Sequence, residues 1–141
     1  MDLEQAAGHL RARGRRMTAQ RRAVLQALGE LGCARGVGEI HARARRLAPR
    51  LGLVTVYRTL DALAAEGVVR PVFLGDGRTR YESAEPEGHH HHLVCLGCGH
   101  VDPFEGCSLQ RLDGTVVGKG FAVATHRLEL FGYCRECRER A

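Results

Sequence analysis

The sequence has no apolar run approaching the roughly 20 residues that a membrane-spanning helix needs. Its opening residues, MDLEQAAGHLRARG, lack the hydrophobic region of a secretory signal peptide. Internal repeats and low-complexity segments are also missing, and 44% hydrophobic with 26% charged residues is a globular composition. We therefore expect a cytoplasmic protein without a membrane partner, with one ordinary domain or two small ones in its 141 residues.

No HExxH or similar motif of a zinc hydrolase is present. A catalytic zinc needs an open coordination position and a general base, and neither is indicated here. A hydrolase would also leave the basic first half of the chain unexplained. We expect no enzymatic activity. A metal-storage or metal-chaperone module is a further class that the sequence leaves open.

Lysine is absent from residues 1–83, yet this half is basic, because 15 arginines against eight acidic residues give a formal charge of +7. Residues 84–141 hold five arginines, Lys119 and eight acidic residues, a formal charge of −2. A basic half joined to a mildly acidic half suggests that the first half meets a polyanion such as DNA. A solvated arginine-rich surface would give the same charge.

Apolar periodicity in the first half predicts helices over 3–14, 19–31, 38–48 and 54–67. A β-hairpin with its turn at Asp76-Gly77 follows. Helices followed by a hairpin are typical of a winged helix-turn-helix, in which the helix before the wing enters the major groove. The candidate DNA contacts are Arg16, Thr55, Tyr57, Arg58 and Arg78, with Arg80 also at the wing tip. The alternative for Tyr57 is a half-buried core position.

The polar segment SAEPEG, residues 83–88, is interpreted as a hinge between two domains, 1–83 and 84–141. The second domain is expected to contain strands at 90–95 and near 100–104, a helix around 107–118, a strand at 121–131 and a short C-terminal helix. The predicted fold class is therefore α+β, a winged-helix domain followed by a small α/β domain.

Two CxxC pairs are the strongest chemical signal, and their cysteines are Cys95, Cys98, Cys134 and Cys137. Four thiolates can surround one Zn²⁺ tetrahedrally. A unit of some 55 residues with a small core needs such a cross-link for stability. We therefore predict a structural zinc. A pair of redox disulfides is the alternative.

The stretch HHHHLVCLGCGH, residues 89–100, is internal and so is not typical of a purification tag. Side chains alternate along a strand, so His89 and His91 would share one face and His90 and His92 the other. The run could thus supply two metal sites. Candidate partners are His126 and the acidic residues Glu82, Glu85, Asp102 and Glu105, with Cys33 and His100 as further possibilities. Cys33 is otherwise a small buried residue, and Cys107 is interpreted as the start of a helix.

Taken together, the stretches GRRMTAQRRAVLQAL, GLVTVYRTLDALAAEGVV, HHHHLVCLGCG and HRLELFGYCREC resemble the ferric uptake regulator family over nearly the whole chain. This resemblance implies a homodimeric, metal-dependent repressor whose winged helix binds an inverted-repeat operator in double-stranded DNA. It also implies structural zinc on the four cysteines and a C-terminal dimerisation domain.

The resemblance further implies a sensing site with His90, His92 and Glu82, and a second site with His89, His91 and His126. The family's glutamate in the second site is replaced by Gln110, a poorer ligand. Other ligand positions of the sensing site hold Ala34, Arg70, Ala84 and Pro103, so Cys33, Asp102 or Glu105 could supply the fourth ligand. The regulatory ion is Zn²⁺, Fe²⁺, Mn²⁺ or Ni²⁺. A peroxide sensor that oxidises a ligand histidine is the alternative function, which Asp102 would favour.

Overall fold

The computed structural model describes residues 2–84, 90–107 and 109–140. It divides into two compact units, residues 1–87 and residues 88–141, and each is described by itself. Within the described ranges, no helix combines the length and the apolar character needed to cross a membrane. His89 and Glu85, two of the candidate ligands, lie outside these ranges, and the side chain of Gln110 is not described either.

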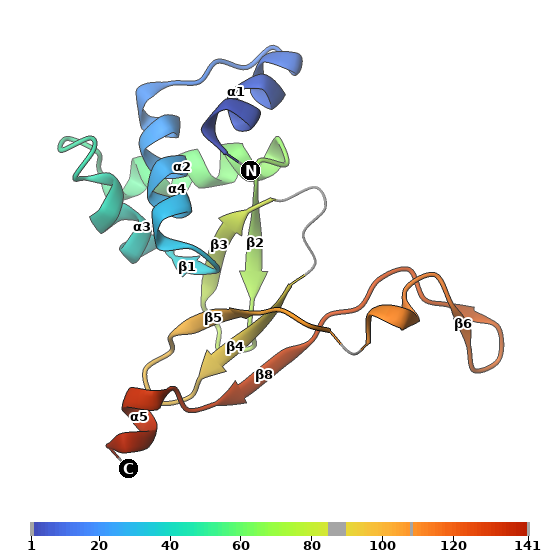
Figure 1. Cartoon of the computed structure of the whole chain (residues 1–141). Helices are drawn as coiled ribbons and strands as arrows, with labels where there is room; N and C mark the ends of the chain where they lie inside the picture. Colours follow the sequence, from blue (N-terminus) through green and yellow to red (C-terminus); the bar gives the residue numbers. More distant parts are fainter. Residues whose placement is uncertain (1, 85–89, 108, 141) are drawn as a thin grey trace. The chain divides into compact units, whose positions relative to one another are not determined.

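Four predicted helices form in the first unit, as Figure 1 shows. Their bounds are α1 Leu3–Ala12, α2 Ala19–Leu31, α3 Val37–Ala44 and α4 Leu53–Ala65. The side chain of Asp2 accepts a hydrogen bond from Gln5 N at 2.8 Å and so caps α1. Thr18 Oγ1 accepts one from Arg21 N at 3.2 Å and caps α2 at the predicted position. The helix predicted over 38–48 ends four residues early, at Ala44.

The apolar stripes of these helices meet in one core, which includes Leu10, Leu28, Ile40 and Leu60, all fully buried. Each such side chain contributes about 1.5–3 kcal/mol through its removal from water. The core residues recur at helical spacing along each element, which is why the sequence predicted the elements correctly. The first unit therefore has its own stabilising interior.

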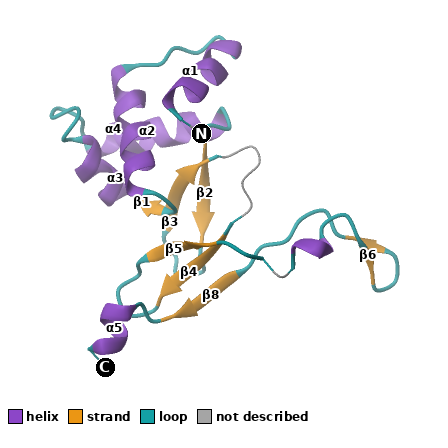
Figure 2. Ribbon diagram, in the orientation of Figure 1, coloured by secondary structure: helices purple, strands orange, loops and turns teal. Residues whose placement is uncertain are grey.

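The wing is a small antiparallel sheet in the order β1-β3-β2, shown beside the helices in Figure 2. Its strands are β1 Arg35–Gly36, β2 Val69–Phe73 and β3 Thr79–Ser83. The register pairs Arg70 with Glu82, so these two side chains share one face of the sheet. The predicted winged helix-turn-helix is confirmed. The two-residue strand β1 was not predicted, because it is too short to show alternation.

The second unit is built on a sheet in the order β5-β4-β8. The strands are β4 His91–Cys95, β5 Val101–Phe104 and β8 Glu129–Gly132, and α5 Arg135–Glu139 follows them. Strand β4 is central, antiparallel to β5 and parallel to β8. The histidine run therefore enters the middle of the sheet, and the first CxxC pair begins where β4 ends.

The helix predicted around 107–118 is wrong for the described residues of this segment. They form the short 3-10 helix η1 Gln110–Leu112 and a hairpin of β6 Val116–Val117 and β7 Phe121–Ala122. Gly114 and Gly118 have φ values of +76° and +56°, which an α-helix does not accommodate. The strand predicted over 121–131 is accordingly split between β7 and β8. Figure 1 shows the hairpin extending away from the sheet.

The second unit has little apolar interior. Among its described residues, the buried apolar side chains are Val94, Cys95 and Val101, and His91 and His92 are buried beside them. Hydrophobic burial on this scale cannot offset the entropy of ordering some 50 residues. Its stability must therefore come from other sources, such as metal ligation.

Candidate metal centres

The four cysteines of the CxxC pairs come together at one end of the second unit. Cys95 ends β4, Cys98 lies in the following turn, Cys134 caps α5 and Cys137 lies within it. The four sulfur atoms all lie within 4.8 Å of one another, and Cys98 Sγ is 3.8 Å from Cys134 Sγ. Four sulfurs at ~2.3 Å from a tetrahedral Zn²⁺ would be separated by about 3.8 Å. The donor set and its spacing therefore fit zinc.

A disulfide would require two sulfurs about 2.05 Å apart. All six cysteines lie in the described part of the chain, and no disulfide joins any two of them. The arrangement therefore favours the predicted metal site over the redox alternative.

The electrostatics of the four-cysteine cluster call for a cation. The amide N–H of Cys134, 3.3 Å from Cys95 Sγ, and then that of Cys98 lower the pKa of Cys95 to about 6. Cys137 is hydrogen-bonded to Cys134, then to Cys95 and Cys98, and these neighbours raise its pKa to about 12. The first thiolate therefore forms readily, whereas complete ionisation of the cluster needs a positive charge at its centre.

Gly97 is where the chain must pass close to this cluster. A Cβ added there would lie 2.8 Å from Cys137 Sγ and 3.0 Å from Cys137 Cβ, closer than side chains approach. A ligating Cys137 cannot swing away, so we expect Gly97→Ala to lower zinc affinity at least about tenfold. Gly132→Ala is the matched control, because its Cβ would meet nothing within 4 Å. Competition with a chromogenic chelator measures both, and equal zinc retention by the two variants would contradict the expectation.

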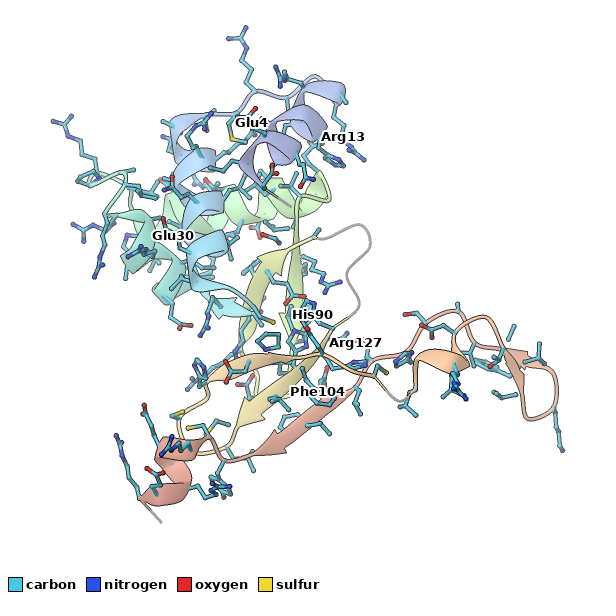
Figure 3. The ribbon with its side chains drawn as sticks, viewed as in Figure 1. Glu4, Arg13, Glu30, His90, Phe104 and Arg127 are labelled. Carbon is cyan, nitrogen blue, oxygen red and sulfur yellow. The ribbon has the colours of Figure 1, made fainter. Side chains whose placement is uncertain are left out.

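The three described residues of the histidine run, His90, His91 and His92, alternate between the two sides of the strand, as predicted. His90 and His92 lie edge to face with ring centroids 5.2 Å apart, and Figure 3 labels His90. His91 points to the opposite side, where its ring centroid lies 5.2 Å from that of His126. His91 and His92 are 2% and 7% exposed, so neither is a solvated surface histidine. The run therefore presents imidazoles to two separate environments.

Asp102 belongs to the other face of this sheet from His92. The register pairs His92 with Pro103 and Leu93 with Asp102, so Asp102 shares the face of Leu93. Its carboxylate lies 3.0 Å from His100 Nε2. Glu105 is exposed, and it joins none of the clusters of potential ligands among the described residues. Of the four acidic candidates, Asp102 and Glu105 are therefore not partners of His90 and His92.

In the first unit, Cys33 and Glu82 form a second pair of potential ligands. Cys33 Sγ donates to Glu82 Oε2 at 3.2 Å, and Arg70 Nε donates to Glu82 Oε1 at 2.5 Å. Burial, followed by the charge of Glu82, raises the pKa of Cys33 to about 12. Cys33 is thus a hydrogen-bond donor to a carboxylate that is only 3% exposed, not the small apolar residue expected.

A further cluster lies on the His91 side of the sheet, and it contains one residue, Cys107, that the sequence analysis did not assign to it. One ligand atom each from His91, Cys107 and His126 lies within 4.8 Å of the other two. Hydrogen bonding to Asp113, and then to Cys107, raises the pKa of His126. His91 and His126 were predicted to share a site, but Cys107 was assigned to a helix start. An isolated cysteine 12 residues after Cys95 gave no sequence signal beyond its residue type.

Most of the predicted DNA-contacting residues are exposed to solvent. Tyr57 is 48% exposed on α4, so it is not a core aromatic. Thr55 is half-buried, and the other residues of the predicted set are exposed: Arg16, Arg58 and Arg78. Arg80 differs, because it is only 5% exposed and both its terminal nitrogens donate to Asp76, at 2.9 and 2.8 Å. Arg80 therefore stabilises the wing turn and is not an open phosphate contact.

Residues 12–131 match the model of the ferric uptake regulator family. The chain is 37% identical over 128 residues to the zinc uptake regulation protein of Mycobacterium tuberculosis, covering 90% of this chain and 98% of that protein. It is 36% identical over 121 residues to the ferric uptake regulation protein of Rhizobium leguminosarum, covering 85% and 84%. The solved ferric uptake regulator of Helicobacter pylori superposes with a TM-score of 0.80 at 27% identity, covering 98% and 95%. The chain belongs to the ferric uptake regulator family.

Proposed function

We propose that this protein is a metal-responsive, sequence-specific repressor that binds double-stranded DNA as a homodimer in the cytoplasm. The observation that carries the proposal is the combination of helix α4, which exposes Tyr57 and Arg58 and precedes a wing, with a second unit rich in metal-ligating side chains. Relatives named as zinc and ferric uptake regulators support genes of metal homeostasis as its targets. A storage module would have no use for Tyr57 and Arg58.

Two metals have different tasks in this proposal. Zinc on Cys95, Cys98, Cys134 and Cys137 would hold the start of the second unit to its end and so keep the dimerisation domain folded. A regulatory divalent ion would be bound by His90 and His92 of the second unit together with Glu82 and Cys33 of the first. Each pair alone offers only two donors, fewer than the three or four protein ligands that a divalent transition metal usually takes.

Bound to both units, the regulatory ion would fix the angle between them. The two helices α4 of the dimer would then be held at the spacing of an inverted-repeat operator. Because the ion favours the DNA-binding arrangement, operator DNA must in turn raise metal affinity by the same factor. One sulfur, two imidazoles and one carboxylate suit Zn²⁺ better than Mn²⁺, since thiolate is a soft ligand.

The peroxide-sensing alternative is less well supported. It depended on an acidic ligand beside the histidines, and Asp102 lies on the other face of the sheet from His92. The alternative needs a site rich in carboxylate ligands. Cys33 would contribute a sulfur ligand instead of a carboxylate. We therefore retain metal sensing as the proposed function.

Operator binding tests the proposal directly. A duplex selected from a random library by the zinc-loaded protein is titrated with protein that keeps zinc on its four cysteines, verified by metal analysis, and that a weak chelator has freed of exchangeable ions. Zn²⁺, Fe²⁺, Mn²⁺ or Ni²⁺ is then added separately. We expect binding that depends on at least one ion and weakens steeply with salt, because arginines replace counterions on the phosphates. Binding that is equally strong with and without every metal would refute a metal-dependent repressor.

Arg58→Ala should weaken operator binding by about 1–3 kcal/mol, or roughly 5- to 150-fold, if Arg58 reads a base edge. Arg111→Ala removes the same charge from an exposed position of the second unit and serves as the control. Fluorescence anisotropy with the selected duplex and a scrambled one separates base readout from charge. Equal losses in the two variants, or equal losses on both duplexes, would exclude Arg58 from base recognition.

A further inference from the structure

We propose that Cys107 is a metal ligand that, with His91 and His126, forms a third site selective for thiophilic ions such as Zn²⁺. The inference concerns the second unit alone and does not depend on the proposed repressor function. The family resemblance implies a glutamate ligand at the position of Gln110, which is a neutral amide. In this proposal the ligand is instead the sulfur of Cys107, three residues earlier in the chain.

The geometry around His126 is that of a prepared metal ligand. Its Nδ1 lies 2.8 Å from Asp113 Oδ1, and its Nε2 lies 3.0 Å from Cys107 Sγ. In the neutral ring, donation from Nδ1–H to the carboxylate leaves the lone pair on Nε2, directed at the sulfur. A carboxylate that fixes the tautomer of a ligating histidine in this way is common behind metal-bound imidazoles.

The sulfur is held in place as well. Leu109 N donates to Cys107 Sγ at 3.2 Å, so the thiol is oriented by backbone of its own segment. In a tetrahedral zinc site, nitrogen at ~2.05 Å and sulfur at ~2.3 Å from the ion are about 3.6 Å apart. The observed separation of 3.0 Å therefore needs to open by only about half an ångström to admit an ion.

His91 completes the donor set from the central strand. It is 2% exposed, and its Nδ1 accepts a hydrogen bond from Leu128 N at 3.2 Å. The neutral ring offers one lone pair, so an ion bound to His91 would take the place of this hydrogen bond. Two imidazoles and one thiolate form a set that selects Zn²⁺ over Fe²⁺ or Mn²⁺, because sulfur is a soft ligand. A site made with Gln110 in place of Cys107 would lack this preference.

Cobalt is a suitable probe, because Co²⁺ bound to a thiolate shows a sulfur-to-metal charge-transfer absorption. The protein carries Zn²⁺ on its four-cysteine cluster, verified by metal analysis, and the substitutions Cys33→Ser, His90→Ala and His92→Ala to remove the other candidate site. We expect one equivalent of Co²⁺ to bind with this absorption, and added Zn²⁺ to displace it. Cys107→Ser in the same background should abolish the absorption and weaken binding at least tenfold, whereas Gln110→Ala should change neither.

Retention of the absorption and affinity in Cys107→Ser, or their loss in Gln110→Ala, would overturn the proposal. A second measurement avoids any dependence on folding of the Cys107 variant. In the same background with Cys107 intact, Zn²⁺ should protect Cys107 from alkylation by iodoacetamide, as read by peptide mass spectrometry. Alkylation at an unchanged rate with zinc present would also reject Cys107 as a ligand.

Discussion

Cys98→Ser is expected to unfold the second unit while the first unit stays folded. The substitution removes one of four cysteine sulfurs that all lie within 4.8 Å of one another. Structural zinc in small domains contributes on the order of 10 kcal/mol of folding free energy. The few buried apolar residues of this unit, Val94, Cys95 and Val101, cannot compensate for a loss of that size.

Amide NMR spectra distinguish the two units in this experiment. Signals from the first unit should remain dispersed, because its core of Leu10, Leu28, Ile40 and Leu60 lies entirely within it. Signals from residues 90–140 should collapse toward random-coil positions, and the dimer should dissociate. Cys33→Ser is the control, since it removes a thiol from the first unit and should leave the zinc on the four cysteines and the dispersion of the second unit unchanged.

Zinc removal without mutation should give the same result. A chelator strong enough to take the ion should unfold residues 88–141, and restored Zn²⁺ should refold them. If the second unit of Cys98→Ser, or of the chelated protein, keeps dispersed amide signals with no zinc bound, then the cluster is not its main source of stability. The role of zinc in maintaining the dimerisation domain would then have to be abandoned.

The first unit could be predicted almost completely from the sequence. Its helices bury one stripe each, so apolar residues recur at helical spacing, and Thr18 marks the start of α2 by its chemistry. The wing was recognisable because β2 and β3 flank a turn that contains Asp76-Gly77. The pairing of Arg80 with Asp76 could not be read from the chain, since an arginine beside a turn looks the same whether it is solvated or paired.

The second unit was predicted less well, and for a physical reason. The described side chains between 107 and 122 bury little, so no apolar period constrains this segment. Its exposed apolar residues, such as Val116 and Phe121, gave a mixture of helix and strand signals. The CxxC pairs were predictable because two cysteines at this spacing can bind the same metal ion. Cys107 was not, because its partners His91 and His126 lie 16 and 19 residues away, and only the folded chain brings them together.

The double substitution His90→Ala and His92→Ala should abolish metal-dependent operator binding while the dimer and its structural zinc survive. Both imidazoles belong to the proposed regulatory site, and their ring centroids lie 5.2 Å apart. Without them Cys33 and Glu82 are too few to hold the ion, and the coupling between metal and DNA disappears. Such couplings are typically worth 1–3 kcal/mol, so a metal-induced rise of about 5- to 150-fold in operator affinity should fall to none.

Three measurements separate this outcome from general damage. Sedimentation should still show a dimer, metal analysis should still show zinc on the four cysteines, and the melting of the first unit should be unchanged. His100→Ala removes an imidazole that faces Asp102 in the same unit, and it should keep the full metal response. If the double variant still binds the operator only after metal is added, then the regulatory ion is held elsewhere, and the population shift driven by His90 and His92 is the wrong mechanism.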